Sequence, residues 1–170
     1  MREFAEWLQA TPVSTTFQSI EWFIPLLQSI HIVTIGIVFV SSLMIALRVL
    51  GRVRADESFA AVWGRFAPWM WYGLIVMAIT GALLVIGEPV REFMTLSFWL
   101  KMSLLAISVV GTAVLGRSLL RPATPAGTPE FSAGAKTAAV AIVVLWLAII
   151  FLGRAIAYDV EVWGSLSLHG

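Results

Sequence analysis

The chain has 170 residues, of which 59% are hydrophobic and 12% charged, and its mean hydropathy is +0.92. So few polar residues could not cover a soluble domain, and we therefore expect an integral membrane protein in contact with a lipid bilayer. The net charge of +1 argues against nucleic acid as a partner. The absence of cysteine excludes disulfides, thiolate zinc sites and covalently attached c-type haem.

The first residues predict a short helix that lies in the membrane interface. It covers residues 2–10 and ends at Thr11-Pro12, after which a polar Ser-Thr-Thr stretch reads as a linker. Its acidic residues and the early Trp7 are unlike the basic start of a signal peptide, so we expect it to be retained. Trp7, Phe17 and Trp22 suit the headgroup boundary, where aromatic side chains collect.

Four long apolar stretches follow, each long enough to cross a hydrocarbon core of roughly 30 Å. They cover about residues 22–49, 66–87, 98–119 and 135–157. Pro68 falls in the first turn of the second stretch, where proline is tolerated, and residues 121–129 form a proline-rich loop. The simplest architecture is all-α, a single transmembrane domain over residues 1–170 with an antiparallel four-helix bundle.

Lysine and arginine collect on one side of this predicted bundle, and such an excess marks the cytoplasmic side. We therefore expect both termini outside, which in a bacterial inner membrane means the periplasm. Of the 11 basic residues, seven lie beside the loops that join spans one to two and three to four, and four lie opposite. The seven are Arg48, Arg52, Arg54, Arg65, Arg117, Arg121 and Lys136, and the four are Arg2, Arg91, Lys101 and Arg154.

The first span has a polar face around its one histidine. At about 100° per residue, five polar side chains fall within an arc of roughly 140°: Gln28, His31, Thr34, Ser41 and Ser42. An ionisable group at membrane depth costs a few kcal/mol and usually faces a protein interior with a partner. We expect His31 to face the bundle, with Gln28 or Thr80 of the second span as alternative partners. The other histidine, His169, reads as a solvated tail residue.

Met77 and Trp146 are expected at a depth similar to that of His31, which lies roughly 13 to 15 Å below the outer boundary at 1.5 Å per residue. Lys101 and Arg154 are expected nearer that boundary. Each has an alternative explanation. The two basic side chains can extend to the headgroups, Met77 can simply fill space, and His31 can be a neutral, hydrogen-bonded imidazole.

Three short motifs carry a resemblance to a known family: His31 early in the first span, Arg48-Val-Leu-Gly51 at its end, and Phe98-Trp-Leu-Lys101 at the start of the third span. They resemble an uncharacterised bacterial family of small four-helix integral membrane proteins. That family is distantly similar to copper-resistance protein D (CopD) and to four-helix b-type cytochromes. The resemblance implies haem or copper chemistry in the outer half of the bundle. Such cytochromes usually hold each haem between two histidines, whereas this chain has one histidine inside a span.

Two cofactor hypotheses follow. In the first, His31 binds a haem b, Met77 is the opposite ligand, and Lys101 or Arg154 lies near the propionates, for an electron-transfer or haem-handling role. In the second, His31 binds copper in a copper-handling protein.

A third hypothesis has no cofactor: a membrane subunit that binds a periplasmic or membrane protein partner. Its motivation is an aromatic and acidic outer surface with Trp7, Trp22, Trp163, Glu92 and Asp159 among its members. An independent enzyme is not expected, because the chain shows no nucleophile–histidine–carboxylate set and no phosphate-binding loop.

Overall fold

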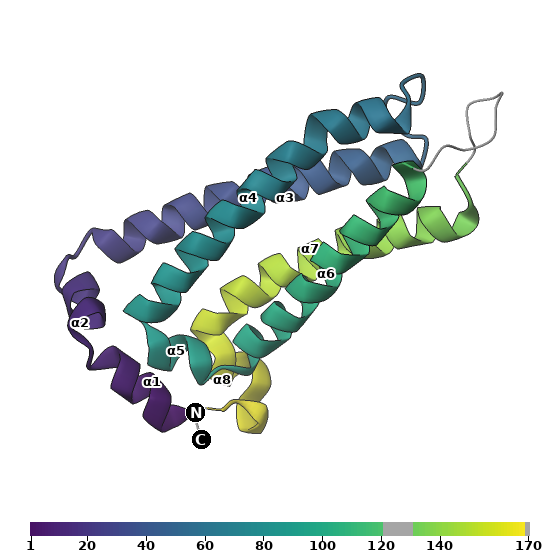
Figure 1. Ribbon diagram of the computed structural model, residues 1–170. Helices are drawn as coiled ribbons and strands as arrows, with labels where there is room; N and C mark the ends of the chain where they lie inside the picture. The colour runs from purple at the N-terminus through teal and green to yellow at the C-terminus, as the bar shows by residue number, and fades with distance from the viewer. Residues whose placement is uncertain (121–130, 169–170) are drawn as a thin grey trace.

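A computed structural model describes residues 1–120 and 131–168. Four long apolar helices dominate it (Figure 1): α3 (Phe23–Val49), α4 (Phe59–Gly87), α6 (Leu96–Leu120) and α7 (Ala133–Ala155). Each is long and apolar enough to cross a membrane. The described residues are otherwise short helices and turns without a strand. The expected all-α, multi-pass four-helix bundle is confirmed.

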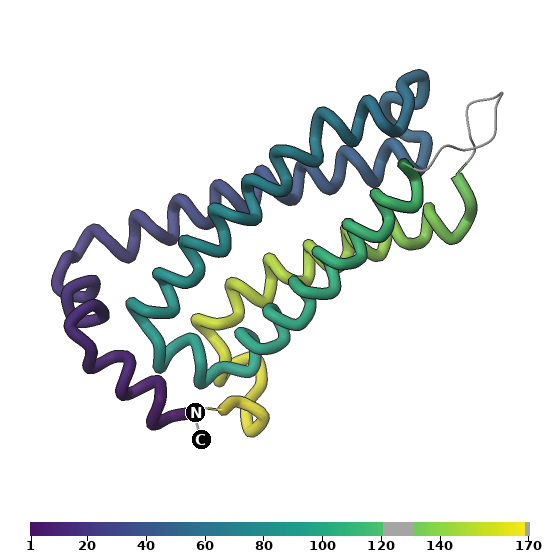
Figure 2. The backbone as a smooth tube through the Cα atoms, viewed as in Figure 1, coloured from purple at the N-terminus to yellow at the C-terminus, as the bar shows by residue number. Residues whose placement is uncertain are grey.

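Short helices gather at one end of the bundle, which we call the capped end. They are α1 (Arg2–Gln9), α2 (Pro12–Ser19), α5 (Pro89–Phe93) and α8 (Asp159–Trp163), with single 3-10 turns at Ile156–Tyr158 and Gly164–Leu166. The backbone tube in Figure 2 shows the first and last described segments together at this end. The opposite end, where residues 50–58 join α3 to α4, is called the loop end.

The long helices form two antiparallel pairs. α3 packs extensively on α4, α6 packs on α7, and α7 also packs on α3, whereas α4 and α6 meet at few points. One such point lies toward the loop end, where a Cβ added at Gly116 of α6 would stand 2.1 Å from the Trp63 ring. The bundle is therefore held mainly by the α3–α4, α6–α7 and α3–α7 interfaces.

Glycines let α3 and α4 approach closely. A Cβ added at Gly73 would lie 2.6 Å from Val38, and one at Gly87 would lie 2.5 Å from Ile24. A Cβ at Gly81 would lie 3.4 Å from Cε1 of His31. These contacts fix which residues of the two helices stand opposite each other.

The predicted linker after residue 10 is wrong, because residues 12–19 form α2. The Thr11 side chain caps this helix by accepting from the backbone N–H of Ser14, at 3.4 Å, and Pro12 occupies its first turn. A Thr-Pro pair that we interpreted as a break is thus a helix start. The Gln18 side chain then donates to the Gly87 carbonyl, at 2.8 Å, and holds α2 against the end of α4.

The second span begins earlier than predicted. α4 starts at Phe59, where the Ser58 hydroxyl accepts from the backbone N–H of Ala61 at 3.1 Å. Residues 59–64 are apolar, but Arg65 separates them from the apolar stretch that begins at Phe66, so the Ser58 cap is the sequence signal for the earlier start. Pro68 consequently lies inside the helix and not in its first turn. Pro68 and Gly64 are both exposed, so the carbonyl that loses its donor lies on the outward side.

At the loop end, α3 ends at Val49, and Gly51 just beyond it has a φ of +69°. The N–H of Arg52 bonds to the Leu47 carbonyl and that of Gly51 to the Arg48 carbonyl, the pattern of a Schellman cap. This conformation explains why a glycine ends the Arg48-Val-Leu-Gly51 motif.

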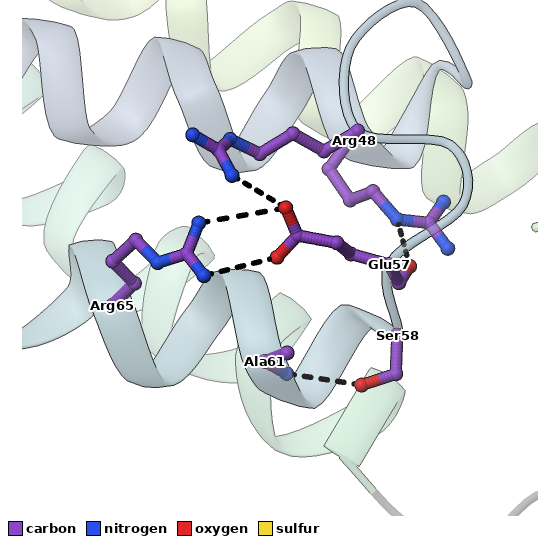
Figure 3. A network of polar contacts seen from close by, with 6 residues as sticks. Arg48, Glu57, Ser58, Ala61 and Arg65 are labelled. Carbon is purple, nitrogen blue, oxygen red and sulfur yellow. Dashed lines mark hydrogen bonds and ion pairs between the residues drawn. The ribbon is translucent and has the colours of Figure 1, made fainter.

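Arg48 then joins α3 to the start of α4 (Figure 3). Its Nε donates to the Glu57 carbonyl at 2.7 Å, and its guanidinium lies 5.2 Å from the Phe131 ring centre. The Glu57 carboxylate pairs with Arg54 and, at 3.2 Å, with Arg65. These contacts, chiefly the hydrogen bond from Arg54, lower the pKa of Glu57.

The residues after α7 are not a simple surface tail. Asp159 is 3% exposed and accepts from the backbone N–H of Leu96, at 3.3 Å, and of Ser97, at 3.0 Å. Its oxygens also accept from the hydroxyls of Ser97 and Ser167, each at 2.7 Å. Asp159 therefore caps α6 from outside, and its predicted place on an exposed acidic surface is wrong. The proline-rich loop and His169 lie outside the described residues.

Candidate functional site

The polar face of α3 points into the bundle, as predicted. His31 is 9% exposed, and Thr34, Ser41 and Ser42 are buried with it. Thr34 satisfies its own hydroxyl by donating to the Ile30 carbonyl at 2.7 Å. His31 instead has its partner on another helix.

Thr80 of α4 is the partner of His31. Nδ1 of His31 lies 2.8 Å from the Thr80 hydroxyl oxygen. That hydroxyl has one proton, which it donates to the Val76 carbonyl at 2.8 Å. With the threonine proton on the Val76 carbonyl, Nδ1 carries the imidazole proton and donates it to Thr80. This arrangement favours the neutral tautomer in which Nε2 is unprotonated.

Nε2 of His31 is buried and has no hydrogen-bond partner among the described residues. Nδ1 contacts Thr80, and Cε1, the carbon between the two ring nitrogens, lies against Gly81 of the same helix. A buried lone pair left unpaired costs roughly 1 to 3 kcal/mol. A histidine with its proton fixed on one nitrogen and its other nitrogen free has the arrangement usual for a metal-ligating imidazole.

Two further buried side chains, Ser108 of α6 and Trp146 of α7, also have a polar atom without a hydrogen-bond partner among the described residues. In the described part of the chain, three fully buried side-chain polar atoms have no hydrogen-bond partner: His31 Nε2, Ser108 Oγ and Trp146 Nε1. Ser108 is 0% and Trp146 is 1% exposed. The depth of Trp146 was anticipated from the sequence, whereas Ser108 was missed.

Ser108 and Trp146 lie opposite each other on the α6–α7 interface. A Cβ added at Gly111 of α6 would lie 3.7 Å from the Ile142 side chain of α7, so these two positions face each other across the interface. Ser108 stands three residues before Gly111, and Trp146 stands four residues after Ile142. Because two antiparallel helices advance equally along their axes, the pairing is preserved to within about one residue. The seven-residue step from Lys101 is the sequence signal that could have identified Ser108.

The level of His31 can be compared with that of Trp146 through the α3–α7 interface. Arg48 lies on Phe131, near the start of α7. Seventeen residues back from Arg48 reach His31, and seventeen forward from Phe131 reach Ala148. At 1.5 Å per residue, His31 and Trp146 are within roughly one helical turn of the same level.

Lys101 lies in the capped half of the same region. Its ammonium packs against Gly153, and it makes no ion pair within 4.0 Å among residues 1–120 and 131–168. The charges of Lys101 and Glu92 act on each other. Lys101 thus has Glu92 as a charged neighbour but no ion pair in the described part of the chain, five residues from the start of α6.

Met77 and Arg154 are placed differently with respect to His31. Met77 is 5% exposed and lies on α4 one turn from Thr80, on the helix that the Nδ1 edge of His31 faces. Arg154 is exposed, and its guanidinium donates to the Tyr158 hydroxyl at 3.0 Å while lying 5.0 Å from that ring's centre. The structure thus brings together His31 and Thr80, places Met77 one turn from Thr80 on the same helix, and engages Arg154 elsewhere.

The donor set restricts which cofactor this region could hold. Among the described residues, no group of three or more His, Cys, Asp or Glu side chains converges on one point. A bare copper or zinc ion needs three or four protein ligands. A porphyrin supplies four nitrogens of its own and needs only one axial ligand. The single imidazole therefore fits haem better than a bare metal ion.

A hollow of about 460 Å³ lies elsewhere, at the capped end. Gln9, Gln18 and the Glu88–Arg91 pair line it. The two charged groups satisfy each other at 2.7 Å, and the hollow does not reach His31. It is therefore not part of the histidine site.

The fold and the site together define a multi-pass, four-helix membrane protein with one buried, hydrogen-bonded histidine. The chain belongs to a family of unknown function (DUF6644), whose model matches residues 3–159. Comparison with curated proteins and with solved structures gives no significant match.

Proposed function

We propose that this protein binds a haem b through Nε2 of His31 in the capped half of the bundle, and that it serves electron transfer or haem handling. The observation that carries the proposal is the buried Nε2 without a partner among the described residues, in a ring that Thr80 orients through Nδ1. When bound, the haem would supply an iron centre that changes oxidation state.

The surroundings of His31 support a planar, apolar group with a charged edge. α4 and α6 make few contacts, so a group entering between them displaces little helix–helix packing. Lys101 lies toward the capped end and could pair with a propionate, which would compensate two charges that are costly at depth. Arg154 is a weaker candidate for this role because Tyr158 already engages it.

The test is an absorbance spectrum with haem analysis of protein purified from cells supplied with a haem precursor. We expect a Soret band that His31→Gln abolishes and that Met77→Leu leaves in place, with a shifted position if Met77 is a ligand. Circular dichroism and gel filtration of each variant check that it is folded. Folded wild-type protein without a Soret band would refute the proposal.

A cofactor-free subunit that binds a protein partner is the second candidate. It is supported by the aromatic side chains exposed at the capped end, such as Trp7 at 62% and Trp22 at 65%. The same side chains also suit a bilayer interface. In this case a Trp146 N–H or a bridging water would satisfy Nε2 of His31, and the purified protein would be colourless.

We also propose that the protein lies in a bacterial inner membrane with its capped end in the periplasm. The support is the excess of Lys and Arg at the loop end. Because the chain has no cysteine, single cysteines can report each side. We expect Gln9→Cys to react with a membrane-impermeant maleimide in intact spheroplasts and Asp56→Cys to react only after lysis. The reverse pattern would invert the orientation.

A further inference from the structure

Ser108 and Trp146 each have a buried hydrogen-bond donor that haem ligation by His31 does not use. We propose that they donate hydrogen bonds to a small exogenous ligand bound on the side of the haem opposite His31, a ligand such as dioxygen or nitric oxide whose outer atom accepts a hydrogen bond. This inference rests on the proposed haem at His31. It assigns the protein to the class of haem proteins in which one side of the iron is open to a small ligand, and not to the class in which two protein side chains ligate the iron.

The Ser108 hydroxyl lacks the bond to its own helix that Ser29 and Ser103 make. Ser41 and Ser42 lack it too, but Ser108 is the most deeply buried of these three, at 0% exposed against 4% and 3%. Ser29 donates to the Pro25 carbonyl at 2.8 Å, and Ser103 donates to the Trp99 carbonyl at 2.9 Å. Such bonds to the preceding turn are the usual solution for serine in an apolar helix. Ser108, fully buried, makes none among the described residues. Its proton is available for a group between the helices.

Trp146 shows the same contrast among the tryptophans. Trp99 donates its ring N–H to the Phe93 carbonyl at 3.1 Å, and Trp163 donates its ring N–H to the Ser97 hydroxyl at 2.8 Å. Trp146 is 1% exposed and has no acceptor in the described part of the chain. A buried indole usually finds a partner, and a phenylalanine would pack without needing one. The unused N–H thus indicates an acceptor that is not a protein group.

The two donors and the histidine come from different sides of the bundle. His31 and its support Thr80 belong to the α3–α4 pair, and Ser108 and Trp146 belong to the α6–α7 pair at nearly the same level. Met77 lies on the same helix as Thr80 and is the alternative protein ligand. Because two buried donors near this level have no protein acceptor among the described residues, we assign the position opposite His31 to an exogenous ligand and not to Met77.

Carbon monoxide is the probe, applied to the reduced, haem-loaded wild-type protein. We expect it to bind, with a C–O stretching frequency that reports the two donors. Trp146→Phe and Ser108→Ala should each raise this frequency and speed carbon monoxide dissociation by about two- to tenfold, the equivalent of one hydrogen bond. Trp69→Phe and Ser103→Ala are the matched controls, because Trp69 is 63% exposed and Ser103 is bonded to its own helix. The controls should match the wild type.

The failure of this inference is distinct from the failure of the haem proposal. A Soret band without carbon monoxide binding, restored by Met77→Leu, would show that Met77 is the sixth ligand and overturn the inference alone. Carbon monoxide binding that neither Trp146→Phe nor Ser108→Ala alters would also overturn it alone. Folded protein without any Soret band would overturn both.

Discussion

The Thr80 hydroxyl determines which nitrogen of His31 carries the proton. By donating to the Val76 carbonyl it can offer Nδ1 only an acceptor, so the lone pair is left on Nε2. A single threonine therefore decides whether the histidine presents a proton or a lone pair to the bundle interior. This applies to haem ligation and to a purely structural role alike.

Replacing Thr80 with valine should remove this control. The expected result is a loss of about 1 kcal/mol of stability, since the buried Nδ1–H loses its acceptor, and a mixture of imidazole tautomers. The measurement is ¹⁵N NMR of histidine-labelled protein in detergent, with thermal unfolding alongside. Thr80→Ser, which keeps the hydroxyl, is the control and should resemble the wild type. A wild-type spectrum in which Nε2 is protonated would contradict the assignment.

At the residue scale, the sequence predicts part of this site and leaves out the rest for a physical reason. Helical periodicity alone places His31 on the buried face, because it depends only on the geometry of one helix. It cannot choose between Gln28 and Thr80, nor identify Ser108. Those contacts depend on the register between helices, which the packing of glycines such as Gly73 and Gly111 sets.

At the element scale, hydropathy predicts the spans because the bilayer imposes their length. It fails for α2, which is held by the Thr11 cap and by the bond from Gln18 to the Gly87 carbonyl. It also fails for the start of α4, which the Ser58 cap determines and which Arg65 separates from the rest of the apolar stretch. Both helix starts depend on single hydrogen bonds that contribute little to any average over a window.

The cap of α6 by Asp159 yields a prediction at the same scale. Asp159→Ala leaves the backbone N–H groups of Leu96 and Ser97 without their acceptor, and we expect a loss of about 2 kcal/mol. Thermal unfolding in detergent measures it, and limited proteolysis should show an earlier cut after α7. Glu161→Ala on the exposed side of α8 should stay within about 0.5 kcal/mol of the wild type. Equal stability of the two variants would contradict the capping role.

At the scale of the whole molecule, the capped end makes stability depend on pH. Burial raises the pKa of the Glu92 carboxyl above its ordinary 4.5, although Lys101 and Arg91 oppose the shift and Glu88 adds to it. The folded state therefore holds this proton more tightly than the unfolded state. Its contribution to stability is present below pH 4.5 and is lost as the pH rises through the folded-state pKa.

Glu92→Gln should remove this dependence, because glutamine stays neutral. We expect the variant's Tm in detergent to vary less than that of the wild type between pH 4.5 and neutral pH, and to exceed it at neutral pH. Glu3→Gln, at an exposed position of α1, serves as the control and should follow the wild type. Parallel pH profiles for Glu92→Gln and the wild type would refute the role of Glu92.

The glycine contacts between α3 and α4 have a consequence for how the two helices find their alignment. Ile24, His31 and Val38 are seven residues apart, as are Gly87, Thr80 and Gly73 opposite them. The two helices thus meet in a heptad interface of three pairs. In the two outer pairs an aliphatic side chain packs on a glycine, and the middle pair, His31 and Thr80, is polar. A slip of one heptad would place His31 against a glycine without an acceptor and Thr80 against Ile24 or Val38. The His31–Thr80 pair thus distinguishes the native alignment of the two helices from its two nearest alternatives, as a buried asparagine does in a coiled coil.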